Sequence, residues 1–287
     1  MRPAWSGRKA LGAARAVLLL VLGALHGAAG AAPAAEGARP LRFGVFPIVS
    51  TVELFRRYVP LRAYLAARLG REVRLETARD FPTFVRRTAA RRYDVVVTAP
   101  HFALLAASPG PYEIRGSLRR TLEGVVVVHR ASRIRGLAAL AGRLVATPPE
   151  PALITLAGRR LFAVHGLTGT RAPRWRAYRS HNAAYEAVAG GDADAAVVSI
   201  NALRKALERE APLREIARTP PLPNTALLVA RDLPERLRAR IEAAFVGADR
   251  DADGRLALQR AGLPGWRPAR RADYEVLRPY LAGLDLR

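Results

Sequence analysis

Hydrophobic and polar positions alternate in short blocks from residue 40 onward. Apolar blocks predict buried strands, and blocks with a helical period lie between them. The first part of this series predicts three strands and two helices, at 41–47, 50–70, 72–78, 80–92 and 93–99. This strand–helix order predicts a mostly parallel sheet with helices on both faces. Ser50 and Glu53 form a capping box at the first helix, and Pro60 is expected to break or kink it.

The same alternation starts again after residue 130. Two strands within 115–130 are followed by helices and strands at 134–142, 143–148, 152–166, 173–180, 182–191 and 193–199. The phrase "YDVVVTAP" (93–100) returns as "ADAAVVSI" (193–200), with an aspartate, an apolar run and a small hydroxyl residue in each. Asp94 and Asp194 are expected to make turn and cap hydrogen bonds. The repeat predicts two α/β lobes of similar build.

A further apolar strand at 222–234 can cross back to the first lobe, and the tail is predicted to be helical. Two crossovers make a hinge, and ligands of parallel α/β sheets bind at the carboxyl ends of strands. We therefore expect lobe 1 at 40–128 plus 225–287 and lobe 2 at 129–224.

The N-terminus has the three parts of a secretory signal peptide. A basic region precedes the apolar run "AVLLLVLGAL" (16–25), and small residues follow it. We expect a signal peptide at 1–31, cleaved after Ala31, with an uncleaved N-terminal anchor as the alternative. The expected location is the periplasm. The chain has no cysteine, which excludes disulfides, thiol catalysis and a lipidated N-terminal cysteine.

The formal net charge of +23 raises the question of a nucleic-acid partner. Only Lys9 and Lys205 are lysine, so 45 of the 47 basic residues are arginine, as a GC-rich genome would produce. These arginines are scattered and not interleaved with aromatic residues. Together with export, this favours solvated surface arginine, and we expect no nucleic-acid partner.

Four stretches, taken in order, carry a family resemblance. They are "VPLRAYLAARLGREVRLETARDFPTFVRR" (59–87), "SHNAAYEAVAGGDADAAVVS" (180–199), "ARTPPLPNTALLVARDLP" (217–234) and "GWRPARRADYEVLR" (265–278). With them the chain resembles the periplasmic phosphate/phosphite/phosphonate-binding proteins of ABC transporters. The resemblance implies an α/β, two-lobed type 2 periplasmic-binding-protein fold, with two crossover strands and a helical C-terminal tail on lobe 1.

The resemblance also implies a function and a site. The protein would close two lobes over a small solute and deliver it to an ABC transporter permease, as a monomer without a cofactor or a metal. A sensor of the same fold that signals to a membrane histidine kinase is the alternative. The residues implied to bind the ligand are Phe46, Ser50, Phe81, Thr98, His101, Thr147, Glu150, His181, Asn224 and Thr225.

One part of this site departs from the family. Phosphonate binders hold the anion on a Ser/Thr-rich helix start, where backbone N–H groups and the helix dipole favour it. The matching stretch here is "ATPPEPALITLAG" (146–158), in which three prolines lack N–H donors, Glu150 adds a negative charge and Thr147 is the one hydroxyl before the helix. Glu150 could contact a ligand or simply start the helix. We therefore predict weak or absent phosphonate binding.

Two further patterns bear on ligand and activity. Asn182 and Thr225 stand where aminophosphonate binders of the family place acids, so an aminophosphonate is not expected. His181 could donate to an oxyanion or cap its turn. No nucleophile elbow, P-loop or zinc-protease motif occurs, and we expect no enzymatic activity.

Overall fold

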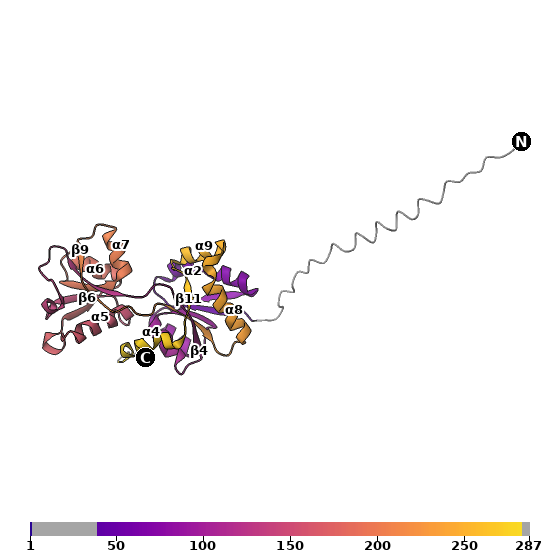
Figure 1. The fold of residues 1–287 in the computed structure, drawn as a ribbon, viewed down its shortest axis with the longest axis horizontal. Helices are drawn as coiled ribbons and strands as arrows, with labels where there is room; N and C mark the ends of the chain where they lie inside the picture. The colour runs from indigo at the N-terminus through magenta and orange to yellow at the C-terminus, as the bar shows by residue number, and fades with distance from the viewer. Residues whose placement is uncertain (2–38, 283–287) are drawn as a thin grey trace. The chain divides into compact units, whose positions relative to one another are not determined.

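The computed structural model describes Met1 and residues 39–282. The predicted signal peptide at 1–31 therefore lies, Met1 apart, outside the described residues. Two separate sheets organise residues 39–282, one of six strands and one of five (Figure 1). The prediction of an α/β fold with two lobes is confirmed, and lobe 1 and lobe 2 below denote each sheet with its helices. Within the described part of the chain, no helix is long and apolar enough to cross a membrane.

Lobe 1 contains the six-stranded sheet. Its strands, in spatial order, are β11 (Trp266–Pro268), β4 (Tyr112–Leu118), β10 (Ala226–Ala230), β3 (Val95–Thr98), β1 (Leu41–Val45) and β2 (Val73–Glu76). Its helices are α2 (Thr51–Leu69), α3 (Phe81–Ala89), α4 (Pro100–Ala107), α8 (Glu235–Val246), α9 (Ala252–Ala261), η3 (Ala248–Arg250) and η4 (Arg271–Tyr280). Phe245 packs edge-on against Phe43 and Trp266, at 5.9 and 5.3 Å between ring centroids. This aromatic cluster fixes the C-terminal tail to the first strand of the chain.

Lobe 2 contains the five-stranded sheet. Its strands, in spatial order, are β7 (Arg174–Ala177), β6 (Leu144–Thr147), β8 (Ala195–Ser199), β5 (Gly124–His129) and β9 (Leu213–Arg218). Its helices are η1 (Leu137–Leu140), α5 (Leu153–Val164), η2 (Gly169–Arg171), α6 (His181–Ala189) and α7 (Ile200–Leu207). In β5, Val125 and Val127 belong to one core cluster, and Val126 and Val128 to another. Both faces of this strand are buried, which explains its unbroken apolar run.

The pairing of strands differs from the expected mostly parallel sheet. The early strands do pair in parallel, β1 with β2 and β3, and β6 with β7 and β8. The strands that arrive from a crossover, β5 and β10, are antiparallel to both of their neighbours. Both sheets are therefore mixed, because each returning strand runs against the strands formed by strand–helix–strand units.

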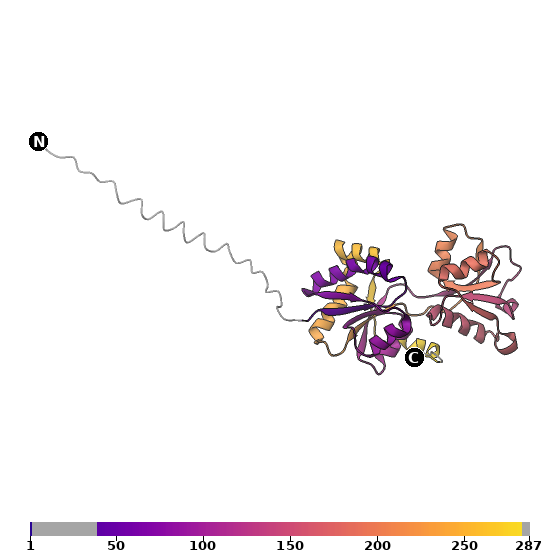
Figure 2. The same cartoon turned by 180° about the vertical axis from the view of Figure 1, so that it is seen from behind.

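The first crossover comes earlier than expected. The expected boundary places residues 124–128 in lobe 1, but β5 pairs with β8 and β9 in lobe 2. The apolar run marks a buried strand and carries no information about which sheet receives it. Leu122 and Leu222 form an isolated antiparallel bridge, so the two crossover segments pair with each other, and they can be followed in Figures 1 and 2.

Pro60 does not break its helix, contrary to one of the two expectations for it. Helix α2 runs from Thr51 to Leu69 with Pro60 inside, and it ends at Gly70 in the left-handed conformation (φ 59°). Its inner face, which includes Leu54, is buried in the core of lobe 1. Tertiary packing of that face outweighs the one backbone hydrogen bond that proline removes.

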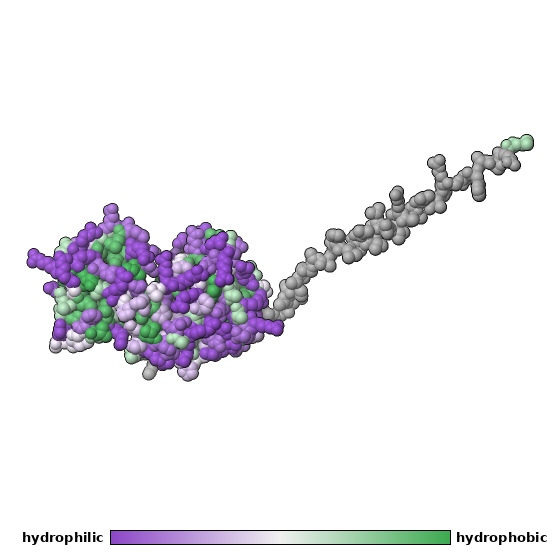
Figure 3. Space-filling model, in the orientation of Figure 1, coloured by the Kyte–Doolittle hydropathy of each residue, from purple (hydrophilic) through white to green (hydrophobic). Residues whose placement is uncertain are grey.

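The repeated phrase has the same structural role in both lobes. The side chain of Asp94 accepts a hydrogen bond from the backbone N–H of Arg42 in β1, and Asp194 accepts from the N–H of Leu144 in β6, each at 2.8 Å. In return, the N–H groups of Asp94 and Asp194 donate to the carbonyls of Arg42 and Leu144. Each aspartate thus secures the start of the adjacent parallel strand. On the face seen in Figure 3, hydrophilic residues cover much of the surface and hydrophobic residues gather in places between them.

Candidate functional site

Loops at the carboxyl ends of strands from both sheets surround a cavity of about 450 Å³. Lobe 1 contributes the loop after β1 and the start of α4, and lobe 2 contributes the loops before α5 and α6. The crossover segments add Leu122, Asn224 and Thr225. We call this space the central cavity. Its position is where α/β sheets place their ligands.

Most of the wall of the central cavity is apolar. Phe46, Phe81 and Phe102 form a chain of aromatic rings, with centroids 6.3 Å apart for the first pair and 6.0 Å for the second. Leu153 and Ile154, from the first turn of α5, line the cavity from lobe 2. Such a wall offers dispersion contacts and excludes water.

The start of α5 offers few donors to an anion. Pro148, Pro149 and Pro151 have no backbone N–H, and all three line the central cavity. The N–H of Ala152 already donates to the carbonyl of Pro149 at 3.0 Å. The hydroxyl of Thr155 donates to the carbonyl of Pro148 at 2.9 Å. At this helix start the three prolines therefore supply no donor, and the N–H of Ala152 and the hydroxyl of Thr155 are engaged within the loop.

His101 connects the two lobes at the central cavity. Its Nε2 lies 3.0 Å from the carbonyl oxygen of Pro151, and because a carbonyl only accepts, Nε2 carries the proton. The side chain is fully buried, and burial lowers the pKa of His101 to about 4. His101 is therefore neutral at neutral pH. Its Nδ1 is a buried acceptor without a partner among the described residues.

The start of α6 presents hydrogen-bond donors. His181 Nδ1 accepts from the backbone N–H of Ser199 at 3.2 Å, so in the neutral ring Nε2 carries the proton. Burial lowers the pKa of His181 to about 4, which keeps the ring neutral at neutral pH. Ser180 Oγ accepts from the N–H of Ala183 at 3.1 Å, which leaves its own hydroxyl proton free to donate. His181 and Ser180 both line the central cavity.

Arg179 is the cationic residue of the central cavity. It is exposed, it lines the cavity beside Ser180 and His181, and within residues 39–282 no carboxylate pairs with it. No acidic residue lines this cavity in the described chain. Arg179 is not among the residues expected from the sequence to bind the ligand. The signal was its position at the end of a predicted strand, one residue before the cap of the next helix.

Asn224 serves the crossover. Its Nδ2 donates to the carbonyl of Arg120 at 2.9 Å, and its Oδ1 accepts from the N–H of Thr225 at 2.7 Å. Both ends of the amide are thus engaged in holding the two crossover segments together. Asn224 and Thr225 line the central cavity, but the amide of Asn224 has little left to offer a ligand.

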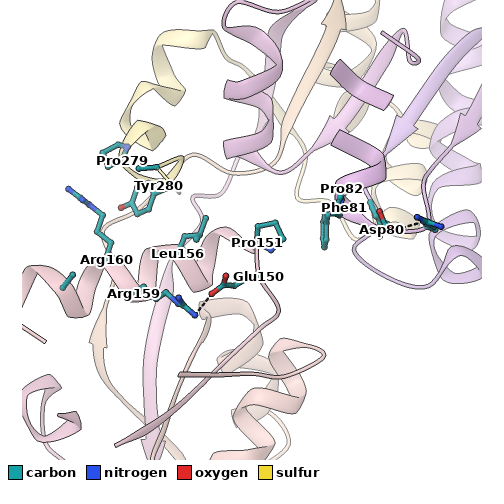
Figure 4. A pocket seen from close by; sticks show the side chains of 14 residues that line it. Asp80, Phe81, Pro82, Glu150, Pro151, Leu156, Arg159, Arg160, Pro279 and Tyr280 are labelled. Carbon is teal, nitrogen blue, oxygen red and sulfur yellow. Dashed lines mark hydrogen bonds and ion pairs between the residues drawn. The ribbon is translucent and has the colours of Figure 1, made fainter. Parts of the chain in front are cut away.

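A second space of about 940 Å³ adjoins the central cavity and shares Pro47, Phe81 and Pro151 with it (Figure 4). Glu150 lies here, paired with Arg159 of α5. Figure 4 shows the carboxylate pointing along α5 toward that arginine. Across this space the guanidinium of Arg160 lies 5.8 Å from the ring centroid of Tyr280 in η4.

The structure places the ten selected residues in several environments. Six line the central cavity: Phe46, Phe81, His101, His181, Asn224 and Thr225. Ser50 caps α2, where its hydroxyl accepts from the N–H of Glu53 at 3.4 Å. Thr98 faces a small space between α3 and α4. Thr147 is buried at the end of β6, and Glu150 lies in the second space.

Among the described residues, no group of three or more histidine or acidic side chains is arranged to hold a metal ion. Asp251, which lies between Asp249 and Asp253, caps α9 by accepting a hydrogen bond from the N–H of Gly254 at 2.8 Å.

Comparisons with known proteins agree on the family and the fold. The family model described as "ABC transporter, phosphonate, periplasmic substrate-binding protein" matches residues 43–274. A Xanthomonas citri protein bound to chloride ion is 19% identical with a TM-score of 0.72, covering 85% of this chain and 96% of its own. A binding-protein component of an ABC phosphonate transporter from Pseudomonas aeruginosa is 17% identical with a TM-score of 0.69, covering 85% and 86%.

A third structure is similar as well. A Prochlorococcus marinus protein in complex with methylphosphonate is 17% identical, with a TM-score of 0.70, covering 84% of this chain and 96% of its own. At these identities the structures establish a shared fold, that of type 2 periplasmic binding proteins.

Proposed function

The chain belongs to the periplasmic substrate-binding proteins of phosphonate ABC transporters, and from this premise we propose that it captures a small organic solute in the central cavity and delivers it to an ABC importer. Membership of this family implies a periplasmic location and a role in ligand binding rather than catalysis. The single observation that carries the proposal is the central cavity, about 450 Å³ in volume and lined by strand-end loops of both lobes.

Capture follows from the way both lobes contribute to one wall. Phe81 of lobe 1 and Ile154 of lobe 2 line the same space, so a solute there is desolvated by both lobes at once. The hydrogen bond from His101 to the carbonyl of Pro151 joins the lobes beside it. A bound solute adds contacts to both lobes and shifts the population toward a closed form that a permease can recognise.

The titratable side chains of the central cavity suit binding better than reaction. His101 and His181 are both held neutral by burial, and their ring nitrogens are engaged by the carbonyl of Pro151 and the N–H of Ser199. Neither histidine is paired with a nucleophile in the described chain. The sensor alternative receives no support from the family model or from the relatives named above.

A ligand screen with a blocked variant tests this proposal. Mature protein beginning at Ala32 is melted with phosphate, phosphonates, sulfate, organic acids and cations. A ligand at one hundred times its dissociation constant adds about 2.7 kcal/mol of stability, which is a shift of roughly 5–10 °C for a chain of this size. Ala152 directly precedes α5 and lines the central cavity. The Ala152→Trp variant should fold, but its indole should fill the cavity and abolish the ligand-induced rise in melting temperature.

Two results would contradict the proposal. In one, no solute of the panel stabilises the mature chain. In the other, the Ala152→Trp variant keeps the full response, so that the ligand binds somewhere else.

A further inference from the structure

We propose that the ligand of the central cavity is an organic anion with one apolar, preferably aromatic, substituent, and that its charged group is held by Arg179, Ser180 and His181 at the start of α6. This inference rests on the proposed function and specifies its substrate class. It moves the anion away from the start of α5. It also makes Arg179 a specificity-determining residue.

The start of α6 is complementary to an oxyanion in three ways. Arg179 supplies a positive charge, and no carboxylate within residues 39–282 forms an ion pair with it. His181 Nε2–H is a fixed donor because the N–H of Ser199 occupies Nδ1. The hydroxyl of Ser180 is free to donate, since its oxygen accepts from Ala183. A guanidinium with two further donors is suited to a carboxylate or a singly charged phosphonate.

The charge balance of the central cavity limits the ligand to a low charge. Arg179 provides one positive charge, both lining histidines are neutral, and no acidic residue lines the cavity in the described chain. The start of α5 adds no second positive side chain, because the charge of Arg159 is paired with Glu150, and its three prolines reduce the number of N–H donors there. A doubly charged inorganic anion would therefore remain partly uncompensated after desolvation.

The rest of the wall matches an apolar group. The rings of Phe46, Phe81 and Phe102 line the lobe 1 side, and Leu153 and Ile154 line the lobe 2 side. Inorganic phosphate would leave these side chains in contact with water or with empty space. A phenyl group would bury apolar area against them and stack with the rings.

Titration calorimetry of the mature chain tests the inference with four probes: phenylphosphonate, benzoate, methylphosphonate and inorganic phosphate. We expect phenylphosphonate to bind at least tenfold more tightly than methylphosphonate and phosphate, and benzoate to bind detectably. Arg179→Gln should weaken phenylphosphonate and benzoate about tenfold. Arg176→Gln removes an exposed arginine of β7 that does not line the cavity, and it should leave binding unchanged.

The possible outcomes separate this inference from the proposed function. Tighter binding of phosphate than of phenylphosphonate, or equal losses in Arg179→Gln and Arg176→Gln, overturns the inference. If none of the four probes binds but another solute stabilises the chain and is lost in Ala152→Trp, the inference is wrong and the proposed function stands. If nothing binds at all, both are wrong. Melting of each variant without ligand shows whether it is folded.

Discussion

His101 is predicted to make the fold sensitive to mild acid. It is fully buried and neutral, with its pKa lowered by burial to about 4 from 6.5. The unfolded chain therefore binds a proton at this site between those two values, and the folded chain does not. Because the unfolded state binds more protons there, stability falls as the pH decreases through this window.

The size of the effect follows from the two pKa values. One pKa unit corresponds to 1.36 kcal/mol, so the full shift of His101 is worth about 3 kcal/mol below pH 4 and about 2 kcal/mol at pH 5. At pH 7.5 the contribution vanishes, because the ring is neutral in both states. His181 adds a loss of the same direction, since its pKa is also lowered to about 4.

Urea unfolding of the wild type and of His101→Gln at pH 7.5 and pH 5 isolates this contribution. Glutamine does not titrate, and its amide can still donate to the carbonyl of Pro151. The loss of stability between the two pH values should be about 2 kcal/mol smaller in His101→Gln than in the wild type. The matched control is His129→Gln, at the end of β5 and half-buried, which removes a histidine that does not line the central cavity. Equal pH dependence in the wild type and His101→Gln would mean that burial of His101 does not cause the loss of stability in acid.

Three further predictions concern packing and charge. Gly158→Ala should lower the free energy of unfolding, measured in urea, by about 1–3 kcal/mol, because the added Cβ would lie 2.6 Å from a methyl of Val197. In the control Gly136→Ala the added Cβ meets no atom within 4 Å, so the loss should be smaller. Asp94→Asn should lower the free energy of unfolding by about 3 kcal/mol at pH 7, since the carboxylate of Asp94 is fully buried among arginines. The side chain of Asp194 is 30% exposed, and Asp194→Asn should lower it by less than about 1 kcal/mol. The partners of Asp94 lower its pKa to about 2, so its contribution should disappear as the pH falls from about 4 to 2, and the two aspartate variants should converge in acid.

Local patterns predicted the elements because hydrophobic period and capping are local properties. The strand at 93–99 and the helix cap at Ser50 follow from neighbouring residues, and the structure has β3 at Val95–Thr98 and the cap at Ser50. The sheet that receives β5 depends on β8 and β9, far along the chain. An apolar run has the same appearance in either sheet. The boundary between lobe 1 and lobe 2 could therefore not be predicted from the sequence.

The candidate site was also predictable in part: the sequence indicated several of its residues, but not the contacts that the fold gives them. The strand-end rule and the family resemblance led to His101 and His181, which line the central cavity. They could not reveal the tautomer of either ring, which is set by Pro151 and Ser199 through the fold. Arg179 was hidden among many arginines, and its place in the wall of the central cavity, which depends on the fold, distinguishes it.

The histidines offer the most direct test of the binding account. After removal of the predicted signal peptide, the chain contains four, His101, His129, His165 and His181, of which the first and last line the central cavity. The measurement is a titration of ¹⁵N-histidine-labelled mature protein with phenylphosphonate, followed by NMR at neutral pH. We expect the ring signals of His101 and His181 to shift while those of His129 and His165 stay in place. Shifts confined to His129 and His165, or none at saturating probe, would contradict it.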